Sequence, residues 1–207
     1  FATNFGTNSI LVFNSATNLL YRTLQNPEVP TAWSISPAGD RMAVADSVIR
    51  LWDLVGLTQL NQESRDVSAI DMFLTNEATP RTYYAGVTSS FLGLWNNSGL
   101  LENGTVLPAG TAFDVRVNPT GTRVVVFRYA PSGCSTPIYL DFYDISVITS
   151  EPAFLGSRFL FTWPCWGPQP VPRAAFSHDG QLVLAGVGNY AVPAQLINLG
   201  DGTVIHE

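Results

Sequence analysis

The sequence predicts an all-β fold built from repeated four-stranded units, and three observations lead to this prediction. The 207 residues include 17 glycines, 14 prolines and 12% aromatic residues, a mixture that suits short strands and tight turns better than long helices. A short hydrophobic motif that ends in Asp or Asn recurs along the chain. A second motif, a strand followed by a turn, alternates with the first.

The first motif is an alternating apolar segment that ends in a large hydrophobic residue followed by Asp or Asn. Successive Asp or Asn positions are 39, 43, 48 and 54 residues apart. These spacings bracket the period of about 40–50 residues expected for repeated four-stranded units. The copies are Ile10–Asn14, Ile49–Asp53, Leu92–Asn96, Leu140–Asp144 and, in weaker form, Gln195–Asn198.

The second motif is a strand that runs into a tight turn, and another apolar strand follows each copy. Ser or Asn opens the turn, Pro presets φ, and Gly accepts a positive φ. Each repeat is therefore predicted to be a four-stranded meander. The copies are Trp33–Asp40, Val115–Thr122, Ala175–Gln181 and, in degenerate form, Ile70–Glu77.

One such sheet cannot bury both of its faces alone, so the units must pack face to face around an axis, which predicts a β-propeller. A β-sandwich with accidental similarity between its strands is the alternative. The chain divides into a partial blade at 1–25, which lacks its innermost strand, and blades at about 26–62, 63–106, 107–165 and 166–207. These four to five blades predict part of a larger ring of about seven blades, completed by further blades or by another chain.

Two segments resemble known propeller repeats. Ile49–Leu54 is similar to the strand that carries the Trp-Asp dipeptide of WD-repeat proteins. Phe1–Asn18 is similar to the YVTN-type repeat of bacterial and archaeal surface propellers. The resemblance covers nearly the whole chain through short motifs. Because the chain lacks the Gly-His pair of full WD repeats, the resemblance does not extend to their buried His–Asp hydrogen-bond network.

The charge pattern disfavours nucleic acid as a partner, and the hydropathy pattern disfavours a membrane-spanning helix. The formal net charge is −6, and the ten basic residues are all arginines scattered along the chain, so no cluster could follow a phosphate backbone. Nucleic acid is therefore not an expected partner. No stretch approaches eighteen uninterrupted apolar residues, so no membrane-spanning helix is predicted.

The two cysteines, Cys134 and Cys165, form a candidate disulfide. The bond would close a loop of about thirty residues and contribute roughly 3 kcal/mol of stability; two separately buried thiols are the alternative. Neither cysteine has a neighbouring Cys or His at ligand spacing, so neither a metal site nor another cofactor is predicted. We expect an extracytoplasmic or secreted protein that is a processed chain or a fragment, since it begins at Phe1.

Polar residues on the innermost strands are the first candidate binding residues, because these strands line the central channel of a propeller. Charges that converge on a funnel can orient a ligand, whereas pairing with each other or with water is the alternative. The channel candidates are Ser34, Asp71, Asp114, Arg116 and Arg173.

A second candidate surface is the long insertion between Arg128 and Arg173. It places Trp163 and Trp166 among prolines in a predicted loop. Exposed aromatic residues on rigid loops are typical binding anchors. Capping of the hydrophobic edge of a blade is the alternative.

No catalytic motif is present, so we expect no enzyme. His178 lies beside Asp179 in a predicted turn, and His206 is next to the last residue. The first hypothesis is an interaction module that presents rim loops to a protein or glycan partner. The alternatives are a propeller enzyme of lactonase or quinoprotein-like type, with which the YVTN similarity is compatible, and a self-associating subunit of a surface layer or fibre.

Overall fold

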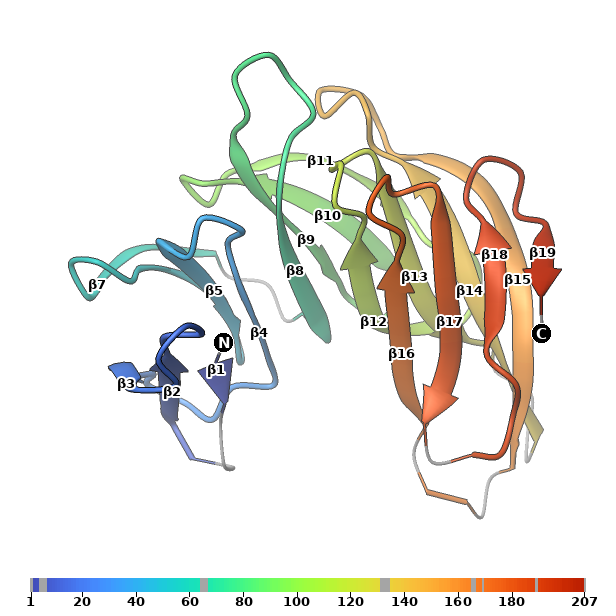
Figure 1. Cartoon of the computed structure of the whole chain (residues 1–207), viewed down its shortest axis with the longest axis horizontal. Coiled ribbons are helices and arrows are strands. Elements are labelled where there is room, and N and C mark those ends of the chain that lie inside the picture. The colour runs from blue at the N-terminus through green and yellow to red at the C-terminus, as the bar shows by residue number, and fades with distance from the viewer. Residues whose placement is uncertain are drawn as a thin grey trace.

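A computed structural model describes residues 2–3, 7–63, 67–130, 135–164, 167–168, 170–188 and 190–206. The regular secondary structure within these ranges is all β-strand, and the strands form five antiparallel sheets in chain order. Figure 1 shows the sheets as a curved series of blades. Since the described ranges contain no helix, none of their segments is a helical membrane span.

Each of the four complete blades contains four strands, and each strand pairs with the next one along the chain. The second blade contains β4 (Ala32–Ile35), β5 (Arg41–Ala45), β6 (Ile49–Asp53) and β7 (Thr58–Glu63). The third contains β8 (Ala69–Leu74), β9 (Thr82–Val87), β10 (Phe91–Asn96) and β11 (Leu101–Val106). The fourth contains β12 (Thr111–Val117), β13 (Arg123–Tyr129), β14 (Ser135–Asp144) and β15 (Ala153–Pro164). The fifth contains β16 (Val171–Phe176), β17 (Leu182–Gly188), β18 (Gln195–Asn198) and β19 (Val204–His206).

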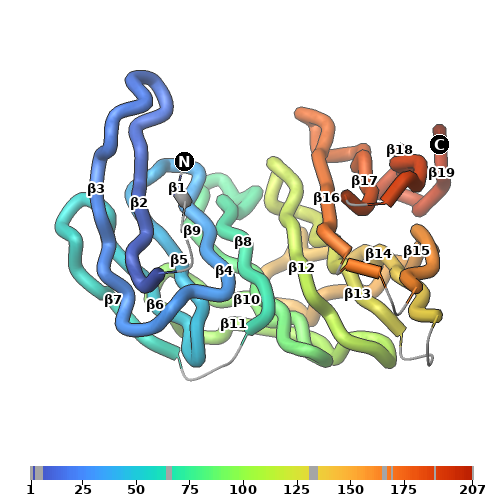
Figure 2. The backbone as a smooth tube through the Cα atoms, turned by 90° about the horizontal axis from the view of Figure 1, so that it is seen from below, coloured from blue at the N-terminus to red at the C-terminus, as the bar shows by residue number. Residues whose placement is uncertain are grey.

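The first blade is a sheet of three strands, β1 (Ala2–Thr3), β2 (Ser9–Phe13) and β3 (Leu20–Gln25). Because Asn14 follows β2, this strand corresponds to the third strand of the other blades. Figure 2 shows an open arc, with a gap between the first and fifth blades. The predicted fold class, an all-β partial propeller with four to five blades, is confirmed.

The Asp or Asn of the first motif closes the turn between the third and fourth strands of each blade. Oδ1 of Asp53 accepts hydrogen bonds from the backbone N–H groups of Val55 (2.8 Å) and Gly56 (3.1 Å), an Asx-turn. The Asp of the Trp-Asp dipeptide therefore stabilises a turn. The same bond to the N–H two residues later is made by Asn14, Asn96, Asp144 and Asn198.

The second motif closes the turn between the first and second strands. Oδ1 of Asn118 accepts hydrogen bonds from the N–H groups of Thr122 (2.9 Å) and Arg123 (3.0 Å). Gly121 has a φ of 65° and donates its N–H to the carbonyl of Asn118 (3.0 Å), a conformation that Gly adopts without steric cost. The corresponding glycines of the second and fifth blades, Gly39 and Gly180, have φ values of 75° and 70°.

Neighbouring blades pack face to face through apolar clusters. In β13, the buried side chains of Val124 and Val126 join the cluster shared with the third blade. Val125 and Phe127, which point to the opposite face, join the cluster shared with the fifth blade. The central strands are therefore apolar on both faces, and each blade needs a neighbour on either side.

The insertion between Arg128 and Arg173 is largely a long hairpin, where a loop was predicted for its aromatic segment. β14 has 10 residues and β15 has 12, and they pair from Ser135 with Pro164 to Asp144 with Ala153. Trp163 therefore lies near the end of a strand. The loop prediction was wrong for the part up to Pro164, because prolines that usually interrupt strands lie here at one end of the hairpin.

Buried Arg–Asp pairs lie inside two blades. Nε and Nη2 of Arg128 donate to Oδ2 (2.6 Å) and Oδ1 (3.1 Å) of Asp141, whose side chain has no exposed surface. In the second blade, buried Asp46 pairs with Arg50 and also accepts a hydrogen bond from Asn26 (2.6 Å). Loss of one partner leaves a buried charge uncompensated, so a substitution of either residue destabilises the folded chain.

We predict that Asn118→Ala destabilises the chain by about 2–3 kcal/mol, since it leaves buried polar groups without partners. Asn118 is 1% exposed, and its amide also donates to the carbonyl of Gly180 in the fifth blade (3.0 Å). Urea denaturation measures the loss. The matched control is Asn14→Ala, at an exposed turn, with an expected cost below about 1 kcal/mol. Equal losses in the two variants would contradict this account.

Candidate functional site

A cleft of about 280 Å³ lies where the first strands of four blades converge. Its walls come from β4, β8, β12 and β16 and from the residues just before β4 and β8, near the points where the chain enters each blade. In Figure 2 these four strands follow the inner side of the arc. The side chains that matter most in the cleft are those of Trp33, Phe113, Asp114, Arg116 and Arg173.

Asp114 contributes a buried carboxyl to the wall of the cleft and is 6% exposed. Its Oδ2 lies 3.2 Å from Nη2 of Arg116, yet this oxygen accepts no hydrogen bond within the described part of the chain. Burial raises the pKa of Asp114 to about 6, although the guanidinium of Arg116 acts in the opposite direction. The carboxyl thus changes its protonation near pH 6, and its Oδ2 has an ion-pair partner but no hydrogen-bond donor among the described residues.

Asp71 links three innermost strands. From β8, its Oδ1 accepts a hydrogen bond from the hydroxyl of Ser34 on β4 (3.0 Å), and its Oδ2 accepts one from the N–H of Val117 on β12 (2.9 Å). Burial raises the pKa of Asp71, and these hydrogen bonds oppose the rise. Neither Asp71 nor Ser34 is among the residues that line the cleft, so both join the strands that form its walls without lining it.

The two arginines of the cleft differ in their pairing. Arg116, on β12, has a side chain that is 40% exposed and faces the carboxyl of Asp114. Arg173, on β16, is exposed, and its Nη1 donates only to the carbonyl of Pro172 (3.4 Å). Because Arg173 forms no ion pair with any described residue, its guanidinium keeps hydrogen-bond donors available to a ligand.

An aromatic row leads out of the cleft and consists of Phe113, Tyr129 and Trp163. Phe113 lines both the cleft and a smaller hollow of about 50 Å³ that it shares with Tyr129 and Trp163. The ring centroids are 5.6 Å apart for Phe113 and Tyr129 and 6.4 Å apart for Tyr129 and Trp163. Nε1 of Trp163 donates to the carbonyl of Pro168 (3.0 Å), which orients the indole. The structure therefore joins the channel surface to the aromatic surface of the insertion.

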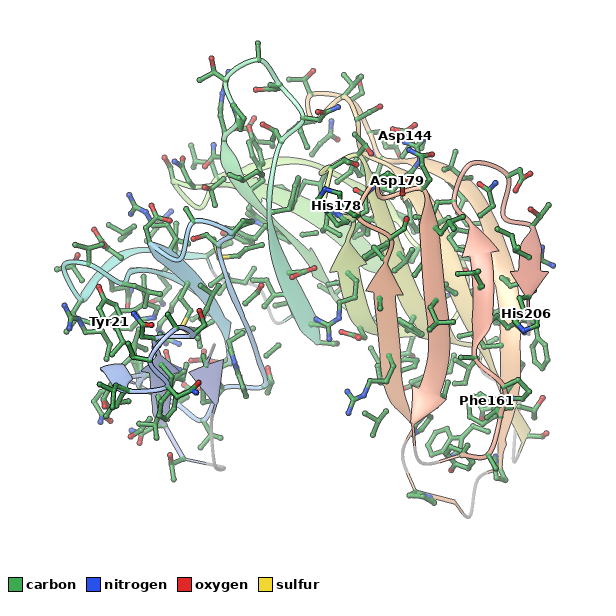
Figure 3. All side chains as sticks on the ribbon, viewed as in Figure 1. Tyr21, Asp144, Phe161, His178, Asp179 and His206 are labelled. Atoms are coloured by element: carbon green, nitrogen blue, oxygen red, sulfur yellow. The ribbon has the colours of Figure 1, made fainter. Side chains whose placement is uncertain are left out.

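Some predicted features lie outside the described residues: Trp166, and the disulfide between Cys134 and Cys165. Within the described ranges, no three His, Cys, Asp or Glu side chains are grouped to hold a metal ion. Figure 3 shows His178 in the turn at one end of the fifth blade and His206 on the outermost strand. Neither histidine lines the cleft.

Sequence reasoning did not identify Trp33 or Phe113 as cleft residues, because aromatic residues on predicted strands are usually assigned to the core. A β-bulge explains the position of Phe113. The pairing of β12 with β13 shifts register between Ala112 and Asp114, which leaves Phe113 between them without a partner. Bulges redirect side chains, and here Phe113 and Asp114 both line the cleft. The sequence did contain one signal: each of these aromatic residues directly precedes a residue that was predicted to line the channel.

Solved structures show where this fold occurs elsewhere. The chain is similar to Kuenenia stuttgartiensis hydrazine synthase, with a TM-score of 0.70 and 12% identity over 95% of this chain and 59% of that one. It is also similar to the β-propeller domain of Myceliophteria thermophila Cps50 (Swd1), with a TM-score of 0.53 and 12% identity over 99% and 81% of the two chains. The chain therefore has a partial β-propeller fold, and it spans 59% of the length of the hydrazine synthase chain.

No family model and no curated protein matches the sequence.

We predict that the free energy of unfolding falls by about 2 kcal/mol between pH 4 and pH 6 through Asp114 alone, out of a total of about 3 kcal/mol between pH 3 and pH 7.5. The pKa of this carboxyl rises on folding from 3.8 to about 6, so the folded chain holds the proton more tightly. The resulting stabilisation is complete below pH 3.8 and is lost as the pH rises through 6. Urea denaturation at several pH values measures the effect. Asp114→Asn should flatten this part of the profile, and parallel profiles for the two proteins would contradict the prediction.

Proposed function

We propose that this chain is a non-enzymatic binding module, a β-propeller scaffold that binds a protein or glycan partner at the cleft on its axis. The proposal rests on two groups that lie together in the cleft. Arg173 is exposed and forms no ion pair with the described residues, and Oδ2 of Asp114 is buried beside Arg116 and accepts no hydrogen bond from them. Ligand sites typically combine a few convergent polar groups with apolar side chains, and this cleft contains both. The neighbouring aromatic row extends the surface available to a partner.

We further propose that the blades are related to WD and YVTN repeats. The Trp-Asp dipeptide of Trp52 and Asp53 lies at the end of β6, the third strand of a four-stranded antiparallel blade. The structural similarity to the β-propeller domain of Swd1 supports the same relationship. The buried pair of Arg50 and Asp46 would then stabilise the second blade in place of a His–Asp network.

A propeller enzyme is the second candidate function, and one observation favours it. A carboxyl with a pKa of about 6 in a cleft, as at Asp114, is suited to acid–base chemistry. Neither histidine is near enough to line the same cleft. Turnover in a panel of lactones and esters that disappears in Asp114→Asn would favour the enzyme over the binding module.

We predict that Arg173→Ala weakens binding of the partner at least about tenfold, because it removes a charge-assisted hydrogen bond. Glycan and peptide arrays probed with the whole chain identify the hits, and titration of each hit measures the loss. Arg173 is exposed, so its replacement should leave the fold intact. The control is Arg81→Ala, an exposed arginine outside the cleft. Arrays without hits, or hits that Arg173→Ala leaves unchanged, would refute the proposed function.

A further inference from the structure

We infer that the cleft and the aromatic row bind an acidic oligosaccharide, with the carboxylate of one sugar unit at Arg173 and a neighbouring hydroxyl at Asp114. This inference rests on the proposed function and specifies the class of ligand. Three features of the surface lead to it: an available cation, a buried acceptor that lacks a hydrogen-bond donor, and a row of aromatic rings that starts in the cleft.

The cation selects an acidic group. Arg173 is exposed and forms no ion pair with the described residues, and Arg116 stands on the neighbouring innermost strand with 40% of its side chain exposed. The planar guanidinium of arginine matches a carboxylate with two parallel hydrogen bonds. Asp71 and Asp114 balance the two arginines when both are ionised. Because Arg116 is already paired with Asp114, the cleft offers one available guanidinium, that of Arg173, and it therefore suits one carboxylate.

The acceptor without a hydrogen-bond donor favours a ligand hydroxyl close to that acidic group. Oδ2 of Asp114 is buried and accepts no hydrogen bond from the described residues. A buried acceptor without a hydrogen-bond donor is costly even beside the Arg116 guanidinium, so a ligand that supplies an O–H group recovers part of this cost. A uronic acid unit carries hydroxyls and a carboxylate on the same ring and can satisfy Asp114 and Arg173 together. An aspartate or glutamate side chain offers a carboxylate alone.

The aromatic row selects a ligand longer than one unit. Phe113 belongs to both the cleft and the row, and the rings of Tyr129 and Trp163 follow it at centroid spacings of 5.6 and 6.4 Å. The three side chains are half-buried, and the indole of Trp163 is held by its hydrogen bond to Pro168. The apolar faces of further sugar rings can pack on this fixed surface. A cleft of about 280 Å³ is itself at the small end of ligand sites, so the remaining units must lie outside it.

Isothermal titration calorimetry of the whole chain tests the inference with four probes: trigalacturonic acid, galacturonic acid, maltotriose and a hexaglutamate peptide. We expect trigalacturonic acid to bind at least about tenfold more tightly than each of the other three. Arg173→Ala should weaken trigalacturonic acid at least about tenfold, and Arg81→Ala should leave it unchanged. Trp163→Ala should weaken the trimer and leave the monomer unchanged, with a thermal melt of the variant to show that it remains folded.

Each contrary result removes a stated part of the inference. Maltotriose that binds as tightly as trigalacturonic acid would overturn the role of the carboxylate, and a monomer as tight as the trimer would overturn the role of the aromatic row. Hexaglutamate bound in place of the saccharides would identify a peptide ligand. If all four probes fail while the arrays give hits that depend on Arg173, the ligand class is wrong and the proposed function survives. If the arrays also fail, both are wrong.

Discussion

The structure depends on sheets that are apolar on both faces. Within β13, Val124 and Val126 pack on the third blade while Val125 and Phe127 pack on the fifth, and all four side chains are fully buried. A sheet of this kind is stable only between two neighbours, so the units repeat around an axis and their first strands converge there. The fifth blade has a neighbouring blade on only one of its faces among the described residues, and its other face is exposed. Val183 and Ala185 are buried against the fourth blade, whereas Leu184, on the opposite face of β17, is 47% exposed.

Convergence of the first strands places polar side chains close together, and these side chains divide into two roles. Asp71 and Ser34 use their hydrogen-bonding capacity to join three strands. Asp114 and Arg173 keep part of theirs unused, on surfaces that line the cleft. The same burial that raises the pKa of Asp114 also makes its Oδ2 costly to leave without a hydrogen-bond donor. Stability and the proposed binding therefore depend on the same side chain, which is why the proposed ligand must carry a hydrogen-bond donor.

Local chemistry made most of the fold predictable. Asp53 and Asn118 stabilise turns through bonds to residues two to five positions away, so their spacing alone marks the ends of strands. The positions of Asp114, Arg116 and Arg173 on first strands followed from the same repeat, and the structure places all three in the cleft. Features that depend on distant residues were not predictable. The bulge at Phe113 and the contact of Asp71 with two other blades have no local signal, and the prolines of the β14–β15 hairpin resembled those of a loop.

Hydrogen–deuterium exchange tests the central claim, that packing on both faces holds the blades, most directly. The amides of β13, buried between two blades, should exchange only when the whole chain unfolds. The amides of β17, which has one covered face, should exchange faster through local opening of the fifth blade. Slower exchange in β13 than in β17 is the predicted result. Equal protection in the two strands, or faster exchange in β13, would show that the blades are stable without neighbours and would contradict the account.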